Sequence, residues 1–157
     1  MKELIMRLAD KTAVIIGAGQ SPGEGVGNGR ATAMLFAREG ARVLCVDRDL
    51  ARAEETAQIL HKEGGVAEAA AADVAVEADL KRVMEQCVDL WGKLDILHNN
   101  VGISIAGGDA GPLEITEEAF DRVMTINLRG TVMAVKHALP IMRKHESGCI
   151  INISSLA

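Results

Sequence analysis

Short apolar runs alternate with longer amphipathic segments along almost the whole of this 157-residue chain. The apolar runs, which predict β-strands, are residues 12–16, 42–46, 66–72, 94–97 and 149–153. The amphipathic segments, which predict α-helices, are residues 30–39, 50–62, 77–91 and 116–144. Strands and helices that alternate in this way form a parallel sheet with right-handed crossovers and helices on both faces. The pattern therefore predicts an α/β fold with a doubly wound parallel sheet.

The composition is that of one domain with an aliphatic core. Hydrophobic residues make up 48% of the chain and aromatic residues only 2%, as expected where helices cover both faces of a sheet. Cys45 and Cys149 lie inside apolar runs and are expected in this core. A chain of this length can build one buried core but is short for two. We therefore expect a single domain over residues 1–157.

Charge and cysteine usage exclude several kinds of partner. The formal net charge is −5 and no basic run compensates for it, so the footprint of a nucleic-acid-binding protein is missing. No segment approaches the roughly 18 consecutive apolar residues of a membrane span, and residues 1–7 are too charged for a signal peptide. The three cysteines, Cys45, Cys87 and Cys149, have no metal-ligand spacing, and their odd number favours free thiols. We expect a cytoplasmic protein without a metal, membrane or nucleic-acid partner.

The first predicted strand leads into a glycine-rich loop that opens the first predicted helix. The loop has glycine at positions 17, 19, 23, 25, 27 and 29. A backbone without Cβ atoms lets amide groups approach a phosphate, and a helix N-terminus favours negative charge, so such a loop can bind a dinucleotide pyrophosphate. A glycine-rich stretch taken alone is also typical of a flexible turn.

Asp47 follows the second predicted strand directly, at the start of the turn into the next helix. A carboxylate in this place can accept hydrogen bonds from both hydroxyls of an adenosine ribose and would repel a 2′-phosphate, which favours NAD over NADP. The neighbouring Arg48 weakens this preference, because a guanidinium can bind a phosphate. The alternative for Asp47 is a cap or turn residue before the helix.

Together with motifs further along, this region resembles the short-chain dehydrogenase/reductase family over about residues 8–157. The family's phosphate loop, Thr-Gly-x-x-x-Gly-x-Gly, is similar to Ile16-Gly17 and, after an insertion within residues 20–26, Gly27-Asn28-Gly29. The insertion could form a flap over the pyrophosphate, but we favour a surface bulge without a role. The resemblance implies a Rossmann-type sheet in the order 3-2-1-4-5, and it assigns to the pyrophosphate Gly17, Gly27, Asn28 and Gly29.

Two further motifs follow in the family's order. Asp73-Val74 resembles the pair that holds the adenine ring, and residues 99–102 resemble the Asn-Asn-Ala-Gly turn that steadies the sheet and lines the nicotinamide ribose. Taken alone, the second motif is also typical of a plain Asn/Gly turn. The cofactor-binding residues that the resemblance implies here are Asp73, Val74, Asn99, Asn100 and Gly102.

The resemblance also implies two catalytic residues. Asn127 lies in the middle of the last predicted helix, where asparagine has poor propensity and usually marks a packing or kink position. In the family the matching asparagine helps to hold a water in a proton relay. Ser155 matches the serine that hydrogen-bonds the substrate carbonyl or hydroxyl. Without the resemblance, Ser154-Ser155 would indicate a turn or a helix cap.

The family's general acid/base is a tyrosine that follows this serine, and a lysine four residues later lowers its pKa. The 157 residues include no tyrosine. We interpret the chain as the N-terminal portion of an NAD(P)-dependent oxidoreductase acting on a secondary alcohol or ketone, inactive by itself. The alternative is a non-catalytic nucleotide-binding or interaction module. Because relatives commonly associate through the helix at 116–144, we also expect a homo-oligomer.

Overall fold

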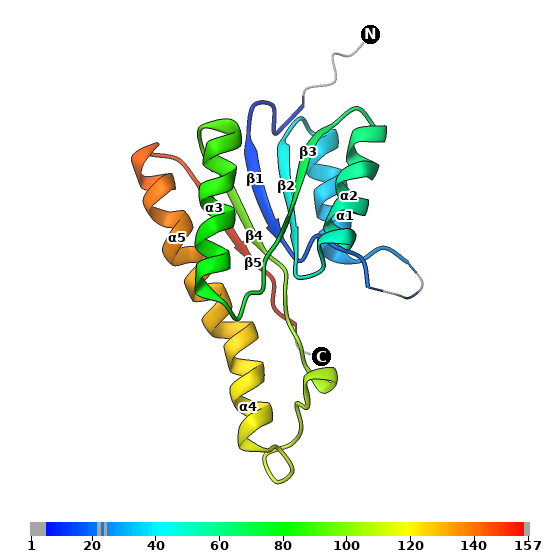
Figure 1. Cartoon of the computed structure of the whole chain (residues 1–157), viewed down its shortest axis with the longest axis vertical. Helices are drawn as coiled ribbons and strands as arrows, with labels where there is room; N and C mark the ends of the chain where they lie inside the picture. The colour runs from blue at the N-terminus through cyan, green and yellow to red at the C-terminus, as the bar shows by residue number, and fades with distance from the viewer. Residues whose placement is uncertain (1–5, 22, 24, 156–157) are drawn as a thin grey trace.

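The chain folds around one parallel sheet. The computed structural model describes residues 6–21, 23 and 25–155. Its five strands lie in the order β3-β2-β1-β4-β5 (Figure 1), which confirms the predicted α/β fold and strand order. The strands are β1 (Thr12–Ile16), β2 (Arg42–Asp47), β3 (Val66–Ala71), β4 (Ile96–Asn99) and β5 (Cys149–Asn152).

Helices cover both faces of the sheet and divide the core into two layers. On one face α1 (Asn28–Arg38) and α2 (Leu50–Lys62) bury alternate residues of β1 and β2, such as Ile15 and Cys45. On the other face α3 (Glu77–Trp91) and α5 (Gly130–Lys144) bury the residues between them, such as Val14, Ile16 and Leu44. This division explains the continuous apolar runs, because neither face of a central strand meets water.

The predicted helix over 116–144 is present but contains a π turn. It consists of α4 (Glu117–Met124), the π-helical turn η2 (Thr125–Arg129) and α5, with the hydroxyl of Thr116 accepting a hydrogen bond from the Ala119 amide at 3.2 Å. In Figure 1, α4 (yellow) projects past the edge of the sheet together with the short 3-10 helix η1 (Ile105–Gly107). No helix among the described residues combines the length and hydrophobicity needed to cross a bilayer.

Several predicted ends were wrong by one or two residues: α1 begins at Asn28, β2 ends at Asp47, β3 ends at Ala71 and β5 ends at Asn152. Two other differences have a physical reason. The fourth strand begins at Ile96 rather than at residue 94, because Asp95 turns the chain by accepting the Thr12 amide on its carboxylate at 2.9 Å. Cys149 is exposed, because it lies on the edge strand β5 and belongs to neither of the two core layers that the helices cover. Cys45 is buried as predicted, and burial raises the pKa of its thiol to about 12.

Candidate functional site

A cleft of about 350 Å³ opens at the carboxyl ends of β1 to β4. It is the place where the loops that follow four strands meet, as expected for a ligand site in an open α/β sheet. All predicted cofactor-binding residues except Asn99 line it, namely Gly17, Gly27, Asn28, Gly29, Asp47, Arg48, Asp73, Val74, Asn100 and Gly102.

The first turn of α1 packs in close contact with the loop that follows β1. A Cβ atom added at Gly29 would lie 1.9 Å from the carbonyl oxygen of Gly17, so only glycine allows this contact. Gly17 itself has a φ of +84°, which also favours glycine. Gly27 occupies the N-cap position of α1 and has no side chain that could accept a hydrogen bond from the amides of the first turn. The N-terminal amides of α1 therefore face the cleft with the positive end of the helix dipole.

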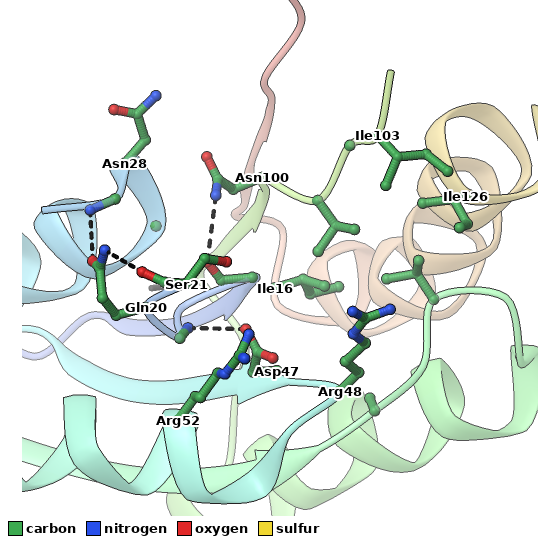
Figure 2. Close-up of a pocket in the computed structure, with 18 of the residues that line it drawn as sticks. Ile16, Gln20, Ser21, Asn28, Asp47, Arg48, Arg52, Asn100, Ile103 and Ile126 are labelled. Atoms are coloured by element: carbon green, nitrogen blue, oxygen red, sulfur yellow. Dashed lines mark hydrogen bonds between the residues drawn. The ribbon is translucent and has the colours of Figure 1, made fainter. Parts of the chain in front are cut away.

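The side chain of Gln20 closes the base of the inserted loop. Its Oε1 accepts a hydrogen bond from the Gly27 amide at 2.7 Å, and its Nε2 donates to the Ser21 carbonyl at 2.9 Å (Figure 2). Residues 22 and 24 of the insertion lie outside the described residues, so the flap and the bulge over 20–26 both stay predictions.

Asp47 stands on the rim of the cleft, between Arg48 and Arg52 in the view of Figure 2. Its Oδ2 accepts a hydrogen bond from the Gly19 amide at 3.1 Å, and its Oδ1 accepts one from the Asp49 amide at 3.1 Å. The residue that caps α2 is Asp49, whose Oδ1 accepts from the Ala51 amide. The carboxylate of Asp47 is thus not the cap of α2. Its bond to the amide two residues later makes it a turn residue before the helix, the other alternative, and its bond to Gly19 turns it toward the glycine loop.

Asp73 and Val74 form the turn between β3 and α3. The Asp73 carboxylate accepts from the Ala75 amide at 2.8 Å, and the Asp73 amide donates to Asp79 at 3.0 Å. That amide, followed by the guanidinium of Arg82, lowers the pKa of Asp79. These bonds hold a rigid turn against the cleft.

The two asparagines after β4 have different partners. Asn100 lines the cleft and donates from Nδ2 to the Gly17 carbonyl at 3.3 Å, which ties the β4 loop to the glycine loop. Asn99 donates from Nδ2 to Oδ1 of Asn152 at 2.8 Å, which ties β4 to β5. Asn99 therefore lies behind the cleft, where it lines a small cavity of about 10 Å³ together with Thr131.

Asn127 lies in the π turn η2 and holds the far wall of the cleft. Its Oδ1 accepts from the Ile103 amide and its Nδ2 donates to the Ile103 carbonyl, both at 2.8 Å. Ile103 and Ile126 line the cleft across from Asp47 (Figure 2). Asn127 thus orients a wall residue and is not itself a lining residue. Ser155 is exposed just beyond β5, outside the set of residues that line the cleft.

The structure adds residues that the sequence did not single out. Arg52 and Ile126 come from helices, and no strand-end motif marks them. Arg52 could have been found, because the first turn of the helix after Asp47 must pass the same rim. The groups of three or more His, Cys, Asp or Glu that would bind a metal are absent from the described residues. The lining residues outside the predicted set include Gly19, Gln20, Ser21, Arg52, Ile103 and Ile126.

Comparisons with known proteins agree with this geometry. The family model of the short chain dehydrogenases matches residues 11–157. An uncharacterized oxidoreductase of Bacillus subtilis is 41% identical over 151 residues, which are 96% of this chain and 52% of that protein. A sorbitol dehydrogenase of Cereibacter sphaeroides is 38% identical over 154 residues, which are 97% of this chain and 55% of that protein.

Solved structures give the same result. A Burkholderia xenovorans protein assigned to the short-chain dehydrogenases/reductases superposes with a TM-score of 0.87 and 39% sequence identity, over 95% of this chain and 57% of that one. The chain spans about half the length of the curated relatives that it matches. Because the family model covers nearly all of its residues, this chain belongs to the short-chain dehydrogenase family.

Proposed function

We propose that this chain is the dinucleotide-binding domain of a longer oxidoreductase that uses NAD. In that protein, hydride would move between the nicotinamide and a secondary alcohol or ketone. The observation that carries the proposal is the position of the Asp47 carboxylate on the cleft rim, beside the uncapped N-terminus of α1. Family membership supports the oxidoreductase class. NADP is the less favoured cofactor, since Asp47 would repel a 2′-phosphate, although Arg48 lies next to it.

The residues of the cleft fit a dinucleotide. A Cβ atom at Gly19 would lie 2.5 Å from Oδ2 of Asp47, so the loop runs directly against the carboxylate. The amides at the start of α1 can take the pyrophosphate charge, with Gly27, Asn28 and Gly29 leaving room for it. Asp47 can accept hydrogen bonds from the ribose hydroxyls, as this strand-end position does in dinucleotide-binding folds.

The remaining cofactor and catalytic roles follow from the family. Asp73 and Val74 would contact the adenine, and Asn100 and Gly102 the nicotinamide ribose, with Asn99 holding the strand behind them. When bound, the nicotinamide supplies or accepts the hydride. Ser155 would hydrogen-bond the substrate oxygen. Asn127 would serve the proton relay while its side chain orients Ile103.

Asp47→Asn should weaken NADH binding by about tenfold or more, because hydrogen bonds to a charged acceptor contribute about 1.5–3 kcal/mol. Binding of NADPH should weaken less, since the repulsion of the 2′-phosphate is removed. Isothermal titration calorimetry of both nucleotides measures the two changes. Asp89→Asn, an exposed carboxylate on α3, is the matched control and should bind NADH like the unaltered chain. Absence of NADH binding by the unaltered chain would contradict the proposed function.

Turnover is proposed for the longer protein alone, because the family's general acid/base is a tyrosine and these residues contain none. Dehydrogenase assays on a panel of secondary alcohols, run on this chain and on a version extended to the length of its relatives, separate binding from catalysis. Binding without turnover in both would favour the alternative, a nucleotide-binding module without oxidoreductase activity.

We also propose that the protein is a homo-oligomer. An apolar side chain recurs every four residues along α4, η2 and α5, at Phe120, Met124, Leu128 and Val132. Between 38% and 53% of each of these residues is exposed. A row of exposed apolar side chains of this kind favours association with another protein surface. We call these four residues the α4–α5 stripe.

Leu128→Glu should convert the oligomer to a monomer, because it places a charge in the middle of the α4–α5 stripe. Sedimentation velocity measures the change. Leu90→Glu, which alters an exposed leucine on α3 (42% exposed), should leave the oligomeric state as it was. A monomeric unaltered chain would refute the association of this domain by itself.

The cellular location is proposed from the thiols. Cys45, Cys87 and Cys149 are all free, as is usual in the reducing cytoplasm. The free thiols therefore support a cytoplasmic enzyme. The net charge of −5 supports small molecules, and not nucleic acid, as its binding partners.

A further inference from the structure

We infer that Thr56 is a positioning residue of the cofactor site, which acts through the peptide group between Ala18 and Gly19. The inference rests on the proposed function, because the group that it positions is the carboxylate of Asp47. Thr56 is fully buried on α2 and does not line the cleft. Its effect on a ligand must therefore pass through another residue.

One peptide group connects Thr56 with Asp47. The Thr56 hydroxyl donates to the Ala18 carbonyl at 2.8 Å, and the Gly19 amide donates to Oδ2 of Asp47 at 3.1 Å. The Ala18 carbonyl and the Gly19 amide belong to the same planar trans peptide, so they point in opposite directions. Fixing the carbonyl toward α2 consequently aims the amide at the carboxylate. The Ala18 amide is held as well, by the Val46 carbonyl at 2.9 Å.

Arg30 limits which group can accept a hydrogen bond from the Thr56 hydroxyl. The Nε of Arg30 donates to Oγ1 of Thr56 at 3.0 Å, so the oxygen accepts there and its proton must go to a carbonyl. Two carbonyls are near, that of Ala18 at 2.8 Å and that of Arg52 at 3.2 Å. The shorter distance favours Ala18. Without the bond to Ala18, the hydroxyl would donate to the carbonyl four residues earlier, that of Arg52, as threonines in helices commonly do.

The guanidinium of Arg30 is itself fixed in place. Arg30 is 8% exposed, and its Nη2 lies 2.6 Å from the Glu55 carboxylate on α2. The hydrogen bond and charge of Arg30 lower the pKa of Glu55, so the pair is ionised at neutral pH. A buried guanidinium with two partners on α2 holds the helix, and with it Thr56, at a constant distance from the loop.

The contact between the loop and Asp47 leaves little freedom for other arrangements. A Cβ atom at Gly19 would lie 2.5 Å from Oδ2 of Asp47 and 2.8 Å from Cβ of Arg52. A rotation of the Ala18–Gly19 peptide would turn the amide away and bring the carbonyl oxygen toward the carboxylate. The carboxylate would then move from the position in which it can accept the ribose hydroxyls.

The test compares the affinities of ADP and 2′-deoxy-ADP, measured by isothermal titration calorimetry on the full chain. The unaltered chain should prefer ADP by about tenfold, since the 2′-hydroxyl donates to a charged acceptor. Thr56→Val should lower this preference about fivefold, the amount expected from one lost hydrogen bond. Thr56→Ser, which keeps the hydroxyl, should restore it. Thr32→Val on α1 is the matched control and should leave the preference unchanged.

Thermal unfolding separates positioning from support of the fold. A merely structural role would lower the melting temperature of Thr56→Val without changing the ratio of the two affinities, and that result would overturn the inference. Arg30→Lys keeps the charge but removes the donor to Thr56, and should also lower the preference for ADP. If Thr56→Val does not fold, the affinities of Arg30→Lys for the two nucleotides test the inference in its place. An unaltered chain that binds both nucleotides equally, or neither, would instead overturn the ribose-binding role of Asp47, and the inference with it.

Discussion

Gly29→Ala should abolish NADH binding and lower the free energy of unfolding by about 3 kcal/mol or more, the upper range for overpacking. The added Cβ would lie 1.9 Å from the Gly17 carbonyl oxygen and 2.9 Å from Nδ2 of Asn100. These are backbone and positioned side-chain atoms, so the strain can be relieved only by moving α1 away from the loop. Urea denaturation followed by circular dichroism measures the stability, and calorimetry measures NADH binding.

Gly27→Ala is the matched control for this substitution. Gly27 has φ and ψ of −65° and 148°, which any residue adopts, and a Cβ there would lie 3.4 Å from Oε1 of Gln20. Its free energy of unfolding should stay within about 0.5 kcal/mol of the unaltered chain. Equal stability of the Gly29 and Gly27 variants would show that α1 does not pack against the loop as described.

Asp95→Asn should lower the free energy of unfolding by about 1.5–3 kcal/mol at pH 7, the usual contribution of hydrogen bonds to a charged group. Asp95 is 8% exposed and accepts from the Thr12 amide at 2.9 Å, and Lys93 lies 2.9 Å from its carboxylate. Burial by itself would raise the pKa of Asp95, but the Lys93 and Thr12 hydrogen bonds and the charges of Lys93 and Lys11 lower it overall.

This lowered pKa fixes the direction of the pH dependence. The stabilisation by Asp95 is complete above the pKa of the unfolded state, about 3.9, and is lost as the pH falls toward the lower folded value. The difference between the unaltered chain and Asp95→Asn should therefore be constant near neutral pH and shrink below about pH 4. Asp10→Asn, with 91% of its side chain exposed, should show no such difference. An Asp95→Asn effect that grows on acidification would contradict this assignment.

Much of the site could be predicted because strand ends are marked in the sequence. Asp47 and Asp73 each follow an apolar run, and the carboxyl ends of parallel strands meet at one edge, so local pattern and topology together bring them to the cleft. The phosphate-binding glycines could be predicted as well, because the loop that contains them directly follows the first apolar run. Gly29 needs no long-range information, because its role is set by the strand-loop-helix unit to which it belongs.

The parts that could not be predicted depend on contacts between distant segments. The partner of Asn127 is the backbone of Ile103, and the position of Thr56 under Ala18 depends on how α2 packs. The start of β4 was misplaced because the turn at Asp95 is made by Thr12, a residue of another strand. Hydropathy could not separate Leu94 from the strand, because its side chain is buried although it precedes Ile96.

The π turn at η2 gives the long helix two separate angular phases. Each residue of an α-helix turns the chain by roughly 100°, so the one extra residue in a π turn offsets everything after it by about that angle. Asn127 can therefore reach Ile103 while Ala134 and Ala138 still face the sheet. In a regular α-helix, either Asn127 would face Ile103 or Ala134 and Ala138 would face the sheet, but not both. Loss of a single residue from Thr125–Arg129 would thus separate the wall of the cleft, which Ile126 and Ile103 line, from the residues of α5 that pack in the core.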